Sequence, residues 1–200
     1  MMERIKNTVI WKEDMVYSKQ VVPTKQITIL ANDPSICAWG YSVLNQDGKI
    51  LETGCIKTES GGKKLRVRKG DDTIRRIREI NERLLSQVKK HNIEYIVSEL
   101  PHGSQSASAA VMIGICMGIL ETISNALEIG IEWYSENDSK RHSLNKSTGE
   151  KLEMVQKMKI IYPNWKPTGT KYIDEAVADS LSIHHLAMKE SPALKLFKMK

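Results

Sequence analysis

The chain has 200 residues, of which 40% are hydrophobic and 27% are charged, a balance typical of one globular domain with a substantial core. The net charge of +6 and the pI of about 9.1 favour a polyanionic partner, although many basic proteins bind no nucleic acid. Three cysteines, Cys37, Cys55 and Cys116, are too few and too far apart for a disulfide framework or a Cys-x-x-Cys zinc site. All three lie in apolar runs, so we expect buried thiols.

The start of the chain lacks the apolar core of a signal peptide, and the apolar stretch 107–120 is too short to span a bilayer. The sequence therefore predicts a cytoplasmic protein, in a bacterium or a phage-infected cell, with no membrane partner.

In chain order, residues 1–25 show no clear period and are interpreted as an N-terminal extension, free to be mobile. From residue 26 the pattern predicts three strands as an antiparallel meander with a hairpin turn at 46–48, and helices then alternate with strands. Basic polar loops are expected at 58–70 and around 135–149. The predicted strands are 26–32, 40–45, 49–57, 94–99 and 129–134, and the predicted helices are 71–91, 104–127, 150–161 and 172–189.

These elements predict an α/β domain over residues 26–190, followed by a basic C-terminal tail at 191–200. Three antiparallel strands followed by parallel ones give a mixed five-stranded sheet with helices on both faces.

Acidic side chains stand at the ends of two predicted strands and in the last helix. Asp33 ends the first strand, although Asp-Pro alone is a common turn opener. Glu99 ends the fourth strand, and Asp174, Glu175 and Asp179 lie in the last helix. Glu175 and Asp179 are four residues apart, so they share a helical face and repel each other unless a cation lies between them. A solvated helix N-terminus is the alternative for Asp174 and Glu175.

The order and contexts of these carboxylates resemble the RuvC family of Holliday-junction resolvases, which are RNase H-like nucleases. The similarity covers about residues 26–190 and rests on Asp33-Pro34, Gly40-Tyr41, the run 54–58, Glu99 and the run 178–181. It implies an RNase H-like fold and an endonuclease that resolves four-way or branched DNA by paired nicks, as a homodimer, leaving 5′-phosphate ends. Recombination and repair are the implied processes.

The resemblance also implies the roles of individual residues. Asp33, Glu99 and Asp179, with Glu175 or Asp174, would hold two Mg²⁺ or Mn²⁺ ions, to which hard oxygen ligands are suited. Lys140 or Lys151 would offset charge on the scissile phosphate, with Lys151 as the catalytic candidate; solvated loop lysines are the alternative.

Three positions depart from the family pattern. Ser35 stands where the family has a glycine after Asp-Pro, and Ala176 stands where it has an acid or a histidine. His102 replaces an aromatic residue near the junction centre. Glu175 is the best substitute for the acid missing at Ala176.

Basic residues suited to contact the DNA backbone are dense in the two predicted loops and at the start of the first helix. A solvated helix face would look similar. The candidates are Lys63, Lys64, Arg66, Arg68, Lys69, Arg75, Arg76, His102, Lys140, Arg141 and Lys146. Gly114 and Gly118 weaken the second helix, which suggests close packing there, at a dimer interface or against the sheet.

Other functions remain open. A ribonuclease that cuts RNA–DNA hybrids would use the same arrangement of carboxylates. Because Ser35 and Ala176 depart from the family pattern, a catalytically inactive protein that binds branched DNA is another alternative. An actin-like ATPase or sugar kinase shares the first strands, but no second glycine-rich phosphate loop is apparent.

Overall fold

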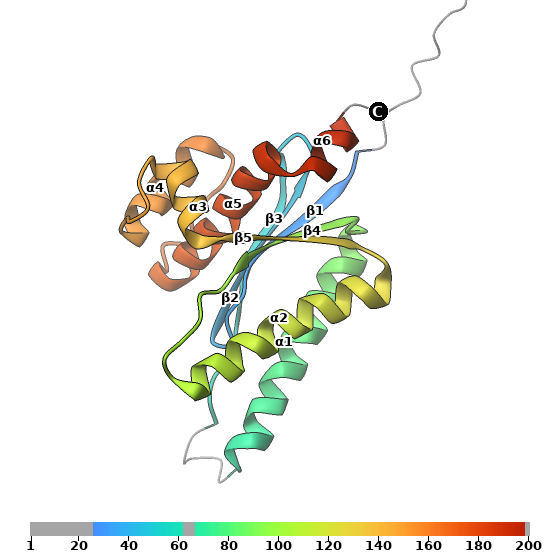
Figure 1. The fold of residues 1–200 in the computed structure, drawn as a ribbon, viewed down its shortest axis with the longest axis vertical. Helices are drawn as coiled ribbons and strands as arrows, with labels where there is room; N and C mark the ends of the chain where they lie inside the picture. Colours follow the sequence, from blue (N-terminus) through green and yellow to red (C-terminus); the bar gives the residue numbers. More distant parts are fainter. Residues whose placement is uncertain (1–25, 62–66, 199–200) are drawn as a thin grey trace, which may run out of the picture.

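A mixed sheet of five strands runs through the centre of the computed structural model, which describes residues 26–61 and 67–198 (Figure 1). Its order is β3-β2-β1-β4-β5, with β1–β2 and β2–β3 antiparallel and β1–β4 and β4–β5 parallel. The predicted α/β fold class is confirmed. The strands are β1 (Thr28–Asp33), β2 (Ala38–Asn45), β3 (Ile50–Lys57), β4 (Tyr95–Leu100) and β5 (Gly130–Ser135).

Helices cover both faces of the sheet, and they differ in how they pack. On one face α1 (Lys69–His91) and α2 (Ala107–Leu127) bury an aliphatic core around Leu30, Trp39 and Ile96. On the other face α5 (Lys171–Glu190) contacts all five strands. The remaining helices surround α5 on that side, as Figure 1 shows: α3 (Glu136–Leu144), α4 (Lys151–Ile161) and α6 (Pro192–Lys198).

Two predictions of irregular structure were wrong. The segment predicted as a loop at 135–149 contains α3, and the predicted tail contains α6, in which Leu194 is buried. The sequence concealed α3 because the side chains that it buries are serines, Ser139 and Ser143, which leave no apolar period. Residues 1–25 lie outside the described part of the chain.

Two predictions about apolar segments also need correction. Cys116 is buried, but Cys37 is exposed and Cys55 is half-buried. The apolar stretch predicted as too short to cross a bilayer belongs to α2, whose 21 residues are long and apolar enough to cross one by length and composition. Ile119, Leu120 and Ile123 of α2 nevertheless pack into the core that α1 and α2 bury against the sheet.

The two glycines of α2 do not pack against the sheet. A Cβ atom built at Gly114 or Gly118 meets no atom within 4 Å among the residues that the structure describes. Close packing within the chain therefore does not explain them, and this face of α2 stays open.

Candidate active site

Asp33 and Glu99 lie side by side because β1 and β4 are parallel neighbours. The register pairs Asn32 with Ser98, so the next residue on each strand is one of these two acids. Ala31 and Val97, two residues earlier, belong to the core on the α5 face. Since side chains alternate along a strand, Asp33 and Glu99 point to the α5 face as well.

Small residues bring α5 close enough to add its own acid. Gly40, the partner of Asp33 in the β1–β2 ladder, faces Ala176, and a Cβ atom built at Gly40 would lie 2.0 Å from the Ala176 carbonyl oxygen. One helical turn further, the hydroxyls of Ser42 and Ser180 lie 2.6 Å apart in the core. This close approach positions Asp179, between Ala176 and Ser180 on α5, above the strand ends.

The three acids perturb one another strongly. Burial first, and then the charges of Asp179 and Glu99, raise the pKa of Asp33 well above its usual value. Burial and the charge of Asp179 raise the pKa of Glu99 to about 8. Burial raises the pKa of Asp179 to about 6, although Lys151 opposes the shift. Half-buried groups of one sign with pKa values shifted in this way are typical of functional sites.

These carboxylates have few partners to offset their charge. Within the described residues, no side chain or backbone group donates a hydrogen bond to the side chain of Asp33 or Glu99, and Asp179 meets only Lys151, with Nζ 4.0 Å from Oδ2. Half-buried like charges with so few partners destabilise a fold, so a function that requires them is the better explanation.

A fourth carboxylate, Glu136, enters the site from the first residue of α3. It raises the pKa values of Asp33, Glu99 and Asp179. Its side chain pairs with Lys140 one turn later, and it lies 3.8 Å from His102. Sequence reasoning missed Glu136 because its helix was predicted as a loop. One signal in the sequence could have found it. Glu136 closely follows the predicted strand 129–134, which runs parallel to the strand that ends at Glu99.

The two candidates for the remaining metal ligand on α5 lie in different surroundings. Asp174 is buried and accepts hydrogen bonds from the Thr168 backbone and hydroxyl and from the Gly169 backbone, at 2.7 to 2.9 Å. It fixes the loop before α5. Glu175 instead raises the pKa of Asp179 and lies 3.9 Å from Lys171. Of the two, Glu175 faces the other acids.

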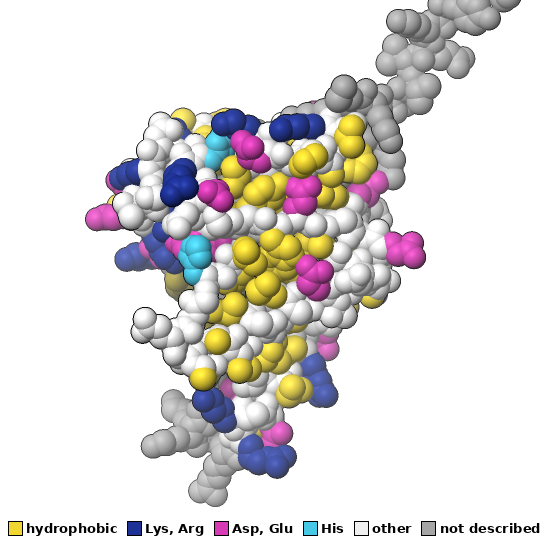
Figure 2. All heavy atoms as spheres, in the orientation of Figure 1, with side chains coloured by type: hydrophobic (Ala, Val, Ile, Leu, Met, Phe, Trp, Pro, Cys, Tyr) yellow, Lys and Arg dark blue, Asp and Glu magenta, His cyan; other side chains and the backbone are white. Residues whose placement is uncertain are grey.

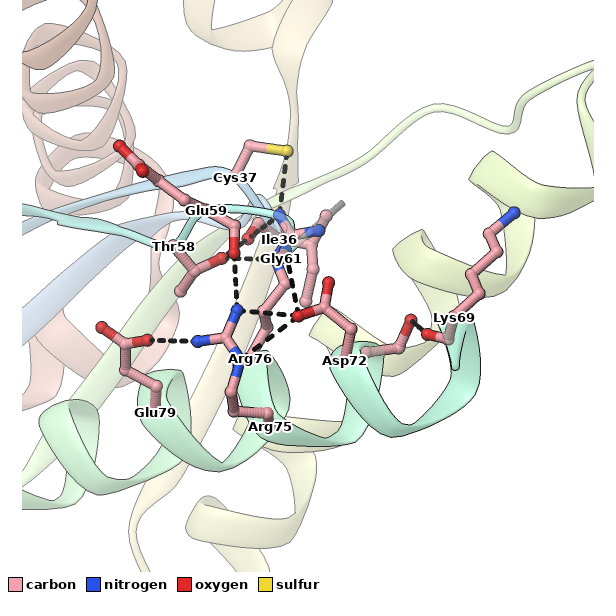
Figure 3. A network of polar contacts seen from close by, with 11 residues as sticks. Ile36, Cys37, Thr58, Glu59, Gly61, Lys69, Asp72, Arg75, Arg76 and Glu79 are labelled. Carbon is pink, nitrogen blue, oxygen red and sulfur yellow. Dashed lines mark hydrogen bonds and ion pairs between the residues drawn. The ribbon is translucent and has the colours of Figure 1, made fainter. Parts of the chain in front are cut away.

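The predicted DNA-binding arginines of α1 are held within the protein, as Figure 3 shows. Arg76 donates to the Thr58 hydroxyl at 2.7 Å, to the Ile36 carbonyl at 2.9 Å and to Cys37 Sγ at 3.1 Å. Arg75 pairs with Asp72 at 2.9 Å and donates to the Glu59 carbonyl. Together they join the start of α1 to the segments that follow β1 and β3.

The other basic candidates are spread over the surface. Arg68, Arg141 and Lys146 form exposed ion pairs with nearby acids, and Lys69 is exposed. Lys63, Lys64 and Arg66 lie outside the described residues. His102, Lys140 and Lys151 are the basic residues that the structure places at the acidic centre.

The donor chemistry fits a hard divalent cation, because carboxylates are the ligands that Mg²⁺ and Mn²⁺ prefer. Among residues 26–61 and 67–198, however, no group of three His, Cys, Asp or Glu side chains is arranged closely enough to hold an ion.

The order and directions of the five strands, with helices on both faces, are those of an RNase H-like fold. Among solved structures, Thermus thermophilus RuvC shares the fold at 17% identity and a TM-score of 0.61, over 80% of this chain and 95% of that chain. RuvC of the same species in complex with a Holliday junction substrate aligns at 15% identity and a TM-score of 0.62, with the same coverage. The yeast mitochondrial Holliday junction resolvase Ydc2 aligns at 15% identity and a TM-score of 0.55, over 86% of this chain and 81% of that chain. No protein-family model matches the chain, and the search of curated proteins finds no relative.

Proposed function

We propose that this protein is a metal-dependent endonuclease that cuts branched DNA, with four-way junctions as its principal substrate. The observation that carries the proposal is the set of half-buried, mutually repelling carboxylates at the ends of β1 and β4 and on α5. The fold that holds them is shared with junction resolvases.

In the proposed mechanism, Asp33, Glu99 and Asp179 would hold two Mg²⁺ or Mn²⁺ ions. Such ions would supply a hydroxide from water and offset charge on the phosphate, so that hydrolysis of the P–O3′ bond leaves a 3′ hydroxyl and a 5′-phosphate end. Lys151 at the start of α4 and Lys140 on α3 lower the pKa values of the acids, so their charges act at this centre. They are therefore placed to attract the scissile phosphate and to orient it.

A groove of about 750 Å³ beside the acids offers a path for the strand. Lys151, Glu175 and Lys171 line it together with Leu152 on α4. Lys171 is almost fully exposed, so its ammonium group is available for a phosphate. The groove adjoins the acidic centre through Lys151, whose Nζ lies 4.0 Å from Asp179, but Asp33, Glu99 and Asp179 do not line it.

The proposal includes a homodimer, because two centres must meet one junction to make paired nicks. Apolar side chains gather on the molecular face over α2 and β5 (Figure 2). Val111 and Leu127 of α2 are 57% and 42% exposed, and the open glycines Gly114 and Gly118 let a second backbone approach. A role in recombination or repair in the cytoplasm completes the proposal.

The first experiment is cleavage of a labelled four-way junction with Mg²⁺, with Mn²⁺ and with EDTA, alongside linear duplex, flap and RNA–DNA hybrid. Paired nicks near the branch point that require metal are the expected result. Junction binding without cleavage under either metal would identify an inactive binding protein, and preferential cutting of the hybrid would identify a ribonuclease.

A further inference from the structure

Glu136 was not predicted as a metal ligand, yet among the remaining acids it has the best position to complete the acidic centre. Ala176, one helical turn before Asp179 on α5, is buried against Gly40 and brings no carboxylate to the centre. Glu136 and Glu175 both raise the pKa of Asp179, so they are the two candidates for a fourth carboxylate.

Helices α3 and α5 run side by side in the same direction, which places Glu136 opposite Asp179. The hydroxyls of Ser139 and Ser182 lie 2.6 Å apart, and the rings of His142 and His185 lie 4.6 Å apart. In both pairs the partner on α5 stands 43 residues after the residue on α3. Residues three apart share a helical face. Glu136 and Asp179 each stand three residues before Ser139 and Ser182, so they should also lie opposite each other.

The sheet brings Glu136 to the same place from the other side. Parallel pairing of β4 and β5 sets Glu99 beside Tyr134 and Leu100 beside Ser135. Glu136 follows Ser135 directly, so it lies at the strand ends, close to Glu99. By contrast Glu175 lies one helical turn before Asp179, beside the groove and Lys171.

The electrostatic field agrees with this placement. Glu136 is among the leading causes that raise the pKa values of Asp33, Glu99 and Asp179, whereas Glu175 is a leading cause for Asp179. The charge of Glu136 therefore acts on all three acids, as the geometry of α3 and β5 predicts.

We propose that Glu136, rather than Glu175, supplies the fourth carboxylate ligand of the metal centre. This inference rests on the proposed metal-dependent function. The existing contacts of Glu136 allow it, because a carboxylate has about four acceptor positions and only Lys140 and His102 approach it among the described residues. Lys140 then stabilises the acid before an ion arrives and remains beside it afterwards.

The test is Mn²⁺ binding to the full chain without DNA, measured by calorimetry and by the loss of the free Mn²⁺ electron paramagnetic resonance signal. Glu136→Gln is expected to weaken Mn²⁺ binding about tenfold or more, as removal of a ligand should at least match the effect of a group that supports one. Glu175→Gln tests the competing candidate by the same loss of charge from the neighbouring helix, and if Glu136 is the ligand its affinity stays within about twofold of the wild type. Glu136→Asp should retain part of the affinity because it keeps an oxygen donor.

Two outcomes overturn the inference: wild-type affinity in Glu136→Gln, or an equal loss in Glu175→Gln. Thermal unfolding of both variants in EDTA checks that the fold is intact, and removal of one repelling charge should not lower the unfolding temperature by more than a few degrees. If Mn²⁺ binds through Glu136 but the wild-type protein cuts no junction, the proposed function fails and the ligand assignment stands. If the wild-type chain binds no Mn²⁺, both fail.

Discussion

Two charged regions of this protein follow opposite rules. Around the start of α1, Arg75 and Arg76 donate to acids, carbonyls and a hydroxyl, so nearly every charge there has a partner (Figure 3). At the ends of β1 and β4, Asp33 and Glu99 face other acids and receive no hydrogen bond from the described residues. The first arrangement stabilises the fold, and the second opposes it.

The comparison shows how paired charges differ from unpaired ones as evidence for function. In the sequence the arginines are dense enough to predict a DNA-binding patch, and in the structure their contacts also join distant segments. Each carboxylate taken alone is weak evidence for function, and the evidence becomes stronger because several of them lie together with few partners. Unpaired charges of one sign, held together by a rigid sheet, indicate a ligand of the opposite sign.

The largest effect should separate two acids on the same helix. Asp179→Asn should lower metal-dependent cleavage by about 10²-fold to 10³-fold or more, the range for loss of one electrostatic group at a reaction centre, without lowering stability. Asp174→Asn removes the charged acceptor of three hydrogen bonds, and it should reduce the free energy of unfolding by about 1–3 kcal/mol while the folded protein still cuts. Junction cleavage and urea unfolding of both variants measure this, and the reverse pattern would overturn the division between the two regions.

Gly40→Ala should pull the acidic centre apart without touching any arginine. The added methyl collides with the Ala176 backbone, so α5 must shift away from β2 and carry Asp179 with it. We expect a loss of about 2–4 kcal/mol of stability, as for an overpacked core position, together with weaker Mn²⁺ binding. Gly114→Ala is the matched control for monomer stability, since its Cβ meets no described atom within 4 Å. Wild-type stability in Gly40→Ala would contradict the close approach of α5.

Arg76→Ala should act on the fold more than on DNA. It leaves the Ile36 carbonyl and the Thr58 hydroxyl without this donor, which costs about 1–3 kcal/mol and lowers the unfolding temperature by several degrees. Arg78→Ala, at an exposed position on the same helix, should stay within about 0.5 kcal/mol. If Arg76→Ala is as stable as wild type but binds a junction much more weakly in anisotropy titrations, Arg76 belongs to the DNA-binding surface after all.

The metal-free protein should lose stability as the pH rises from about 5 to about 8. The folded pKa values of Asp179 and Glu99, about 6 and about 8, lie above those of unfolded Asp and Glu, so the folded state holds more protons in this range. Their stabilising protonation is complete below the unfolded pKa values and is lost as the pH passes the folded ones. Thermal unfolding in EDTA should show this slope, flatter in Asp33→Asn, and Mg²⁺ should oppose it because it binds the deprotonated acids. A flat profile in wild type would show that the pKa values of Asp179 and Glu99 are not raised in the folded state.

The sequence by itself determined the sheet and the strand-end acids. Alternating apolar runs and turn residues indicate the five strands, and Asp33 and Glu99 follow from their places at the ends of two of them. These are local properties, because strand period and turn chemistry depend on neighbouring residues. The three antiparallel strands followed by parallel ones then leave little choice of topology.

Only the tertiary structure decided which charges meet. Asp174 and Glu175 are adjacent in sequence, yet one fixes a loop and the other faces Asp179. Glu136 belongs to α3, which packs on α5 through a contact between serines. An apolar pattern in the sequence does not reveal such a helix. Arg76 became a link between segments because Ile36 and Thr58, distant in sequence, end beside it. Whether a charge is paired depends on contacts between distant segments, and packing alone brings those segments together.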